Sequence, residues 1–172
     1  MNRKVFIGLG SNLGDRFVEM QAACQLLVVN GCRWVQSSPI FETAPWGLVD
    51  QPAFLNAVIQ LEFDGSPQEL LQIAMEAEKE LGRRRLKHWG PRNIDIDILA
   101  MGELEITSQR LTVPHPMLSQ RAFVLLPWAE IAPKFIVAGQ KKSVATLLSE
   151  LPASELTGIE KTDLFFEPVF EE

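Results

Sequence analysis

The sequence predicts an α+β fold in which an antiparallel sheet carries its helices on one face and the functional loops at the other. Apolar residues recur every second residue in some segments and every three to four in others, which gives the order strand, helix, strand, strand, helix, strand. This order is typical of the βαββαβ, or ferredoxin-like, sandwich. With 172 residues, 47% of them apolar, the chain fits a single domain over residues 1–172.

The first strand is predicted over residues 4–9, a short apolar run that ends in a glycine-containing turn at 10–14. Asp15 can cap the following helix, which closes at 30–31. The apolar stripe of this helix is formed by Phe17, Met20, Cys24, Leu27 and Val28. Because Cys24 lies on that stripe, we expect a buried thiol and no disulfide or metal site.

A second strand is predicted over 34–41, a loop over 42–52 and a third strand over 54–63. Alternate residues of the third strand form its apolar face: Leu55, Ala57, Ile59, Leu61 and Phe63. Phe54 and Asn56 project from the opposite face. A ring and an amide together could bind a flat heterocycle, by stacking and by pairing with its edge. The alternative is a ring at the core margin beside an exposed amide.

The second helix is predicted from Pro67 to Gly82. Ser66 supplies the cap, and Glu69 is its reciprocal partner three residues later. The inward residues of this helix are Leu70, Ile73, Ala74, Ala77 and Leu81.

The strand predicted over 92–99 alternates apolar and acidic residues. Its isoleucines share one face, whereas Asp95 and Asp97 stand together on the other, with Cα atoms about 6.6 Å apart. Two like charges on one strand face repel unless a cation lies between them. Mg²⁺ is a suitable cation, since it binds one or two carboxylates together with water and substrate phosphates. A solvated edge strand is the alternative interpretation.

The loop before this strand concentrates positive charge, although the chain has a formal net charge of −6. Its five basic residues are Arg83, Arg84, Arg85, Lys87 and Arg92. Guanidinium groups match phosphate oxygens in pairs, so a cationic loop beside a metal site indicates a polyphosphate ligand. A charged helix C-terminus explains the first three arginines equally well. It explains Arg92 poorly, because Arg92 directly precedes the acidic strand.

Beyond this strand, the sequence predicts a turn at 101–103, a short strand at 104–107 and helical turns that Pro127 interrupts. A last short helix is predicted over 144–151. Residues 152–172 are acidic and irregular, and they either pack as an arm or stay partly disordered. From the sequence alone, His115 between two prolines is an ordinary loop residue.

Composition and motifs exclude several classes of protein. The acidic balance argues against nonspecific binding of nucleic acid or of anionic membranes. No apolar stretch has the length of a signal peptide's core or of a membrane span, which predicts a cytoplasmic protein. No P-loop motif is present, and the glycine-rich fingerprint of dinucleotide-binding proteins fails at Leu13.

Six segments of the chain resemble the 6-hydroxymethyl-7,8-dihydropterin pyrophosphokinases of folate biosynthesis. They are GLGSNLGDR at 8–16, ETAPWG at 42–47, DQPAFLNAV at 50–58, LGRRR at 81–85, WGPRNIDIDIL at 89–99 and LTVPHP at 111–116. The resemblance runs from about residue 5 to residue 133. It implies a ferredoxin-like monomer that transfers the terminal diphosphate of ATP to the hydroxymethyl oxygen of 6-hydroxymethyl-7,8-dihydropterin and releases AMP.

The resemblance also implies roles for individual residues. Asp95 and Asp97 match the ligands of two Mg²⁺ ions that bridge the ATP phosphates, and Arg83 and Arg92 match arginines that hold those phosphates. The other ATP-binding residues that it implies are Glu78, Trp89, Ile98, Arg110, Thr112 and His115. For the pterin it implies stacking between Phe54 and Phe123, pairing with Asn56, and backbone contacts from Thr43, Trp46 and Gly47.

Two other functions remain open from the residues themselves. Another Mg²⁺ enzyme, such as a nucleotide-sugar transferase, could use the acidic pair without a pterin site. A noncatalytic module that senses a metabolite could share the fold and consume no ATP. Release of AMP from ATP in the presence of the hydroxymethyl pterin separates these functions from the pyrophosphokinase.

Overall fold

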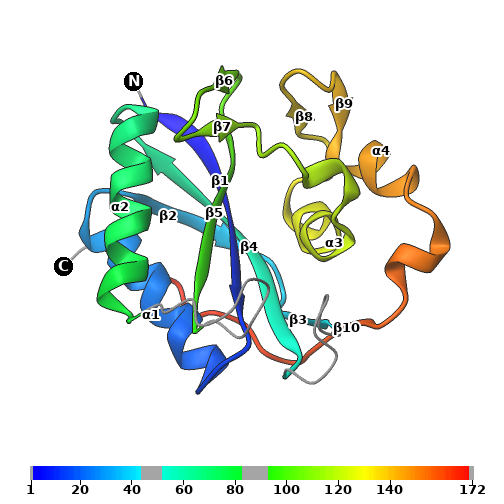
Figure 1. The fold of residues 1–172 in the computed structure, drawn as a ribbon, viewed down its shortest axis with the longest axis horizontal. Coiled ribbons are helices and arrows are strands. Elements are labelled where there is room, and N and C mark those ends of the chain that lie inside the picture. Colours follow the sequence, from blue (N-terminus) through cyan, green and yellow to red (C-terminus); the bar gives the residue numbers. More distant parts are fainter. Residues whose placement is uncertain (1, 44–51, 83–92, 171–172) are drawn as a thin grey trace.

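The computed structural model describes residues 2–43, 52–82 and 93–170. The strands of its main sheet are β1 (Arg3–Ser11), β2 (Arg33–Ser37), β3 (Phe41–Thr43), β4 (Phe54–Phe63), β5 (Asp95–Met101) and β10 (Ile159–Lys161). Their order is β10-β3-β4-β1-β5, and β2 also pairs with β4 (Figure 1). All these pairings are antiparallel, which confirms the predicted antiparallel sheet.

Two helices, α1 (Arg16–Val29) and α2 (Pro67–Glu80), cover one face of the sheet (Figure 1). Both predicted caps are present. Asp15 Oδ1 accepts a hydrogen bond from the backbone N–H of Val18, and Ser66 Oγ accepts one from Glu69, each at 3.1 Å. The core beneath the helices includes Val5, Ile7, Leu9, Met20, Leu27, Ile59, Leu61 and Leu70. Cys24 and Cys32 are free and buried, and burial raises the pKa of Cys32 to about 12.

The opposite face is not left to loops, so this part of the prediction is wrong. Helix α3 (Ala122–Ile131) packs against β4 on that face, and α4 (Val144–Ser149) packs against α3 (Figure 1). A second core forms there from Phe6, Val58, Leu99, Leu118, Val124, Leu125, Trp128, Val137, Val144 and Leu147. The cause is that β1 and β4 carry apolar residues on both faces, and a strand of this kind is buried on both sides.

Two further differences concern proline. The predicted second strand is divided into β2 and β3, because residues 38–40 lie outside both strands and Pro39 has no N–H to donate to a sheet. Within this interruption the backbone N–H of Ser38 donates to the carbonyl of Val58, and Ser38 Oγ accepts the backbone N–H of Val58. Pro127, in contrast, does not interrupt α3 but lies buried inside the helix.

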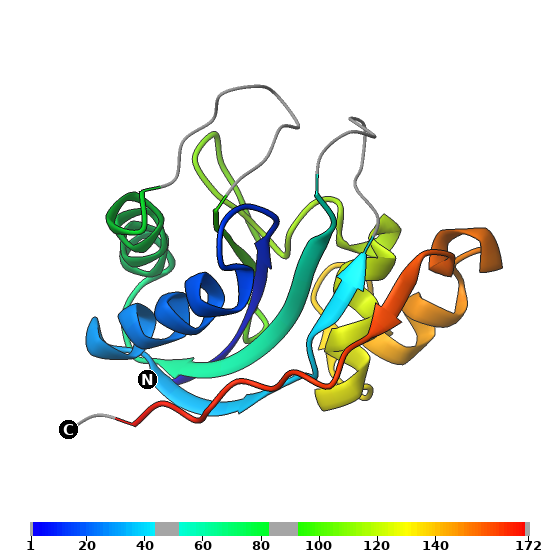
Figure 2. The ribbon, with the colours of Figure 1, turned by 90° about the horizontal axis from the view of Figure 1, so that it is seen from below.

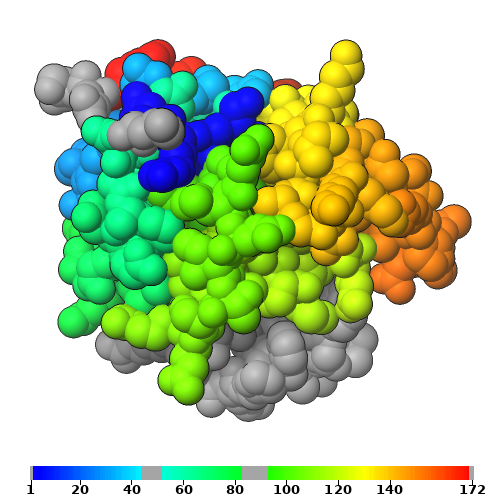
Figure 3. Space-filling model, turned by 90° about the horizontal axis from the view of Figure 1, so that it is seen from above, coloured from blue at the N-terminus to red at the C-terminus, as the bar shows by residue number. Residues whose placement is uncertain are grey.

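Small elements complete the described chain. They are β6 (Ile106–Thr107), β7 (Thr112–Val113), β8 (Ile136–Val137), β9 (Lys142–Ser143) and the 3₁₀ turns Leu118–Gln120 and Ala153–Leu156. Figure 3 shows the residues of β8, β9 and α4, in yellow and orange, gathered at one end of the molecule. None of the helices in the described ranges is long and apolar enough to cross a membrane.

The C-terminal segment packs as an arm. Strand β10 pairs with β3, and the chain then runs back towards α1 (Figure 2). Along this path, Phe166 stacks on Phe17 of α1 with ring centroids 6.1 Å apart. Gln21 of α1 exchanges two hydrogen bonds with the backbone of Glu167. Of the two possibilities left open for this segment, the packed arm is the one observed up to residue 170.

Candidate active site

Strand β1 lies between the two strands that carry the predicted functional residues. Gly10 is the direct partner of Asn56 on β4 and of Asp95 on β5, and Gly8 is the partner of Val58 and Asp97. Direct partners in a sheet point their side chains to the same face. The amide and both carboxylates therefore share one face, and only glycine backbone separates Asn56 from Asp95.

Asp95 and Asp97 lie on the same face of β5, as the alternation of apolar and acidic residues predicted. Asp95 and Asp97 are half-buried, whereas Ile94, Ile96 and Ile98 are buried in the core beneath α1 and α2. Glu78 connects α2 to β5, because its Oε1 accepts the backbone N–H of Ile96 at 2.8 Å. The side chain of Ile98 is thus directed away from the face of the two aspartates.

Arg121 also lies beside Asp97, although it was not among the predicted site residues. Its Nη1 lies 4.0 Å from Asp97 Oδ2, and its Cζ lies 5.7 Å from the ring centroid of Phe123. The guanidinium therefore places positive charge near both Asp97, which was expected on the ATP side of the site, and Phe123, which was expected on the pterin side. The signal in the sequence was only its place two residues before Phe123.

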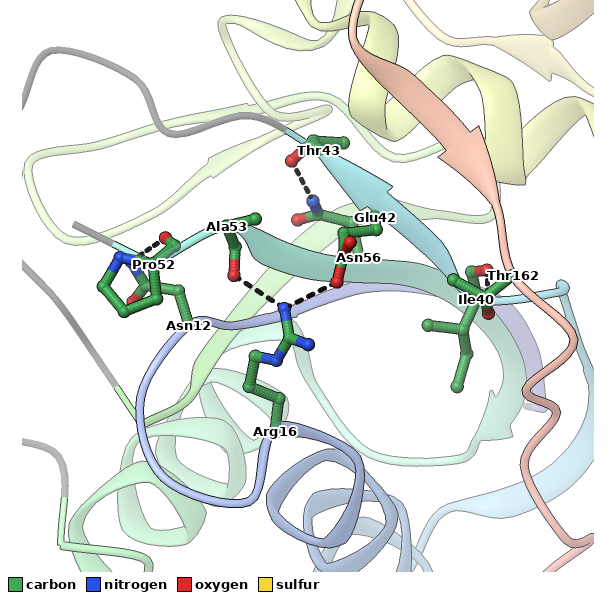
Figure 4. A network of polar contacts seen from close by, with 9 residues as sticks. All are labelled: Asn12, Arg16, Ile40, Glu42, Thr43, Pro52, Ala53, Asn56 and Thr162. Carbon is green, nitrogen blue, oxygen red and sulfur yellow. Dashed lines mark hydrogen bonds and ion pairs between the residues drawn. The ribbon is translucent and has the colours of Figure 1, made fainter. Parts of the chain in front are cut away.

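The amide of Asn56 has a fixed orientation. Asn56 is 7% exposed, and its Nδ2 donates to Thr43 Oγ1 at 2.8 Å (Figure 4). Its Oδ1 lies 3.1 Å from the position that a Cβ on Gly10 would take. Thr43 is the direct partner of Phe54, which is half-buried. Thr43 was expected to contribute backbone contacts, but its hydroxyl also orients the amide.

His115 lies beside the edge of β5. Its backbone N–H donates to the carbonyl of Leu99, and its Nδ1 accepts the N–H of Met117 at 3.2 Å. Burial, with a smaller contribution from Arg121, lowers the pKa of His115 to about 4. The imidazole is therefore neutral near pH 7, and its proton is on Nε2 because Nδ1 is an acceptor.

The remaining predicted residues divide into two groups. Thr112 is in β7, Arg110 is exposed just before it, and Phe123 is half-buried in the first turn of α3. Trp46, Gly47, Arg83, Trp89 and Arg92 lie outside the described residues.

Comparison with known proteins identifies the family. A family model described as 7,8-dihydro-6-hydroxymethylpterin-pyrophosphokinase matches residues 6–133. The chain belongs to this family. A Methylorubrum extorquens protein named 2-amino-4-hydroxy-6-hydroxymethyldihydropteridine pyrophosphokinase is 40% identical over 93% of this chain and 99% of its own length. Proteins of the same name from Mycobacterium tuberculosis and Bacillus subtilis are 37% and 43% identical, over 98% and 76% of this chain and 92% and 79% of their own lengths.

Solved structures agree on the fold. A crystal structure described as HPPK-DHPS in complex with substrates superposes with a TM-score of 0.69 at 13% identity, over 86% of this chain. The Plasmodium falciparum HPPK-DHPS A437G variant with SDX-DHP also gives a TM-score of 0.69, at 14% identity over 87% of this chain. The chain spans 43% and 45% of the lengths of those two proteins.

The residues of this pyrophosphokinase fit a hard divalent cation. Asp95 and Asp97 offer carboxylate oxygens on one face, and the residues opposite them on β1 are glycines that occupy no side-chain space. No group of three or more His, Cys, Asp or Glu that could hold a metal occurs within residues 2–43, 52–82 and 93–170. Two carboxylates with further oxygens from water and phosphates are the usual ligand set of Mg²⁺.

Proposed function

We propose that diphosphate transfer takes place on the face of the sheet that carries Asn56, Asp95 and Asp97. The reaction is that of the family: the diphosphate of ATP passes to the hydroxymethyl group of 6-hydroxymethyl-7,8-dihydropterin, which gives the pterin diphosphate and AMP in folate biosynthesis. The observation that carries the assignment is that Gly10 pairs with both Asn56 and Asp95. A heterocycle held at the amide therefore has its substituent close to the carboxylates.

The pterin side of the site is proposed to consist of the rings of Phe54 and Phe123 and the amide of Asn56. Since Nδ2 of Asn56 donates one hydrogen bond to Thr43, its second N–H and its Oδ1 can pair with a ring edge that offers an acceptor and a donor. An oriented amide binds with little loss of side-chain entropy. Backbone groups of Thr43, Trp46 and Gly47 complete this side in the proposal.

Asp95 and Asp97 are proposed to hold two Mg²⁺ ions. When bound, Mg²⁺ neutralises phosphate charge and lowers the pKa of a hydroxyl that it contacts. Arg83 and Arg92 are proposed to hold the phosphates, and Arg121 adds positive charge beside Asp97. Transfer of this type depends mainly on alignment and on charge stabilisation, so no dedicated base is required of the protein.

The nucleotide is proposed to lie along the edge of β5. Neutral His115 can donate from Nε2 to a phosphate oxygen, and its Nδ1 bond to Met117 keeps it in that form. Arg110, Thr112 and Trp89 are further proposed contacts. Glu78 is proposed to contribute indirectly, through its hydrogen bond to the backbone of β5. Ile98 can contact the nucleotide only through its backbone, because its side chain is buried in the core.

We also propose the finer structural assignments. The strand order β3-β4-β1-β5, with α1 and α2 on one face, supports a ferredoxin-like description. Residues 1–172 are proposed to be one domain that includes the segment 152–172, since this segment contributes β10 and the packed arm. The protein is proposed to be monomeric and cytoplasmic, without nucleic-acid or membrane partners.

The test is a coupled assay of AMP release from ATP, Mg²⁺ and 6-hydroxymethyl-7,8-dihydropterin, with the pterin diphosphate identified by mass. We expect stoichiometric AMP and pterin diphosphate, and neither product without pterin or with EDTA. Formation of ADP, or release of AMP that does not depend on the pterin, would contradict the proposal.

A further inference from the structure

The segment from Ser11 to Arg16, where β1 leads into α1, contacts residues in or next to three other strands: β3, β4 and β5. Ser11 Oγ donates to the carbonyl of Asn93, two residues before β5, and Asn12 Nδ2 donates to the carbonyl of Pro52 at 3.1 Å. Ser11 and Asn12 are 0% and 1% exposed, so both polar side chains are buried and their hydrogen bonds are formed inside the protein. The turn therefore does more than connect a strand to a helix.

Arg16, the first residue of α1, makes the most extensive of these contacts. Its Nη1 donates to the carbonyl of Ala53 at 2.9 Å and lies 2.8 Å from Glu42 Oε2 (Figure 4). Glu42 is the middle residue of β3, and Ala53 directly precedes β4. One guanidinium nitrogen thus joins the end of β3 to the beginning of β4.

These two strand ends carry the residues proposed to bind the pterin. Thr43 follows Glu42, and Phe54 follows Ala53. Thr43 and Phe54 are direct partners, and Thr43 orients the amide of Asn56. A shift of β3 against β4 would therefore change the Thr43–Asn56 hydrogen bond and the position of the Phe54 ring together.

We propose that Arg16 is a positioning residue for pterin recognition: it holds β3 and β4 in the register that orients Asn56 and Phe54. This inference rests on the proposed function of these residues. Exposed ion pairs alone contribute little to stability, and the side chains of Arg16 and Glu42 are 30% and 44% exposed. The hydrogen bond to the Ala53 carbonyl adds a geometric restraint, and small displacements at a site can lower binding or rate considerably.

The test compares Arg16→Met with Arg33→Met. Arg33 also joins neighbouring strands, through an ion pair between β2 and Glu62 of β4, but it lies at the far end of β4 from Asn56. Methionine keeps the apolar stem and removes the donors in both variants. We expect Arg16→Met to raise the KM for the pterin about ten-fold, with KM for ATP and kcat changed less than about two-fold. Arg33→Met should leave all three values unchanged.

A second variant separates positioning from loss of folding. Glu42→Gln keeps an acceptor oxygen and removes only the charge, so it should raise the pterin KM in the same direction but by less. If Arg16→Met alters the far-UV circular dichroism spectrum, Glu42→Gln decides the question. An unchanged pterin KM in the folded variant, or an equal rise of both KM values, would overturn the inference. Wild-type protein that releases no pterin-dependent AMP would instead refute the proposed function.

Discussion

Asn56 and Asp95 lie on either side of one residue, Gly10, which pairs with both across adjacent strands. A Cβ at Gly10 would stand 3.1 Å from Asn56 Oδ1 and 3.9 Å from the ring of Phe54. The separation between the amide and the first carboxylate is therefore set by backbone alone. This close approach favours glycine at this position of an otherwise regular strand.

Gly10→Ala is expected to weaken pterin binding. The new methyl group would press on the Asn56 amide, which is held by Thr43 and cannot rotate without losing that bond. We expect the KM for the pterin to rise about ten-fold, while the KM for ATP changes little. Steady-state kinetics with each substrate varied in turn measures the difference.

Gly8→Ala is the matched control for this substitution. The three atoms nearest to its added Cβ would all belong to the side chain of Leu99, at 3.4 to 3.7 Å, which is ordinary van der Waals contact. The KM for the pterin should stay within about two-fold of the wild-type value. An equal increase in both variants would show that the strand, and not the Asn56 amide, responds to the extra methyl group.

Asp97→Asn is expected to abolish most of the turnover. The substitution keeps the size of the side chain but removes the charge proposed to hold Mg²⁺ and to face Arg121 at 4.0 Å. We expect kcat to fall by about 100-fold or more at saturating Mg²⁺. Asp163→Asn, at an exposed position on the C-terminal arm, should have no effect. Near-normal AMP release by Asp97→Asn at high Mg²⁺ would exclude the metal-binding role.

His115 should make the stability of the protein depend on pH between about 6.5 and 4. Its pKa is lowered to about 4 in the folded chain, so in this range the unfolded chain takes up a proton that the folded chain does not. Stability is therefore lost as the pH falls. His115→Asn keeps an acceptor for the Met117 N–H and removes the titration.

Urea unfolding at pH 7 and at pH 4.5 checks this expectation. Relative to His115→Asn, the wild-type protein should lose roughly 1–2 kcal/mol of unfolding free energy over that interval, because solvent screens part of the effect at this partly exposed imidazole. Other titrating groups are common to the two proteins and cancel in the comparison. A difference between the proteins that stays constant with pH would show that His115 is not kept neutral by the fold.

Local patterns in the sequence were sufficient to predict the helix and the strands that carry the candidate site. The cap at Ser66, the third strand over 54–63 and the alternation of isoleucine with Asp95 and Asp97 each depend on residues a few positions apart. Propensity and periodicity act over that range, so they predict both the element and the face of each side chain. The shared face of Asn56 and Asp95 follows once the strand order is known.

Contacts between distant segments could not be predicted in the same way. Arg121 reaches Asp97 because α3 packs on the second face of the sheet, and no local pattern encodes that packing. The Arg16 contacts to Glu42 and Ala53 depend likewise on the β3–β4 register. The C-terminal arm has no period of two or of 3.6, since it contacts β3 through β10 and then α1 through Phe166 and Glu167, so no single face is repeated along it.

Within that arm, Phe166 is expected to contribute most of the attachment. It is 6% exposed and stacks on Phe17, whereas its neighbour Phe165 is 59% exposed. Phe166→Ala removes a buried ring and should lower the free energy of unfolding by about 3 kcal/mol, whereas Phe165→Ala should change it by less than about 0.5 kcal/mol. Urea denaturation of the two variants measures both values. Equal, small effects would mean that the arm is held by its hydrogen bonds to Gln21 and Ile40 and not by the Phe166 ring.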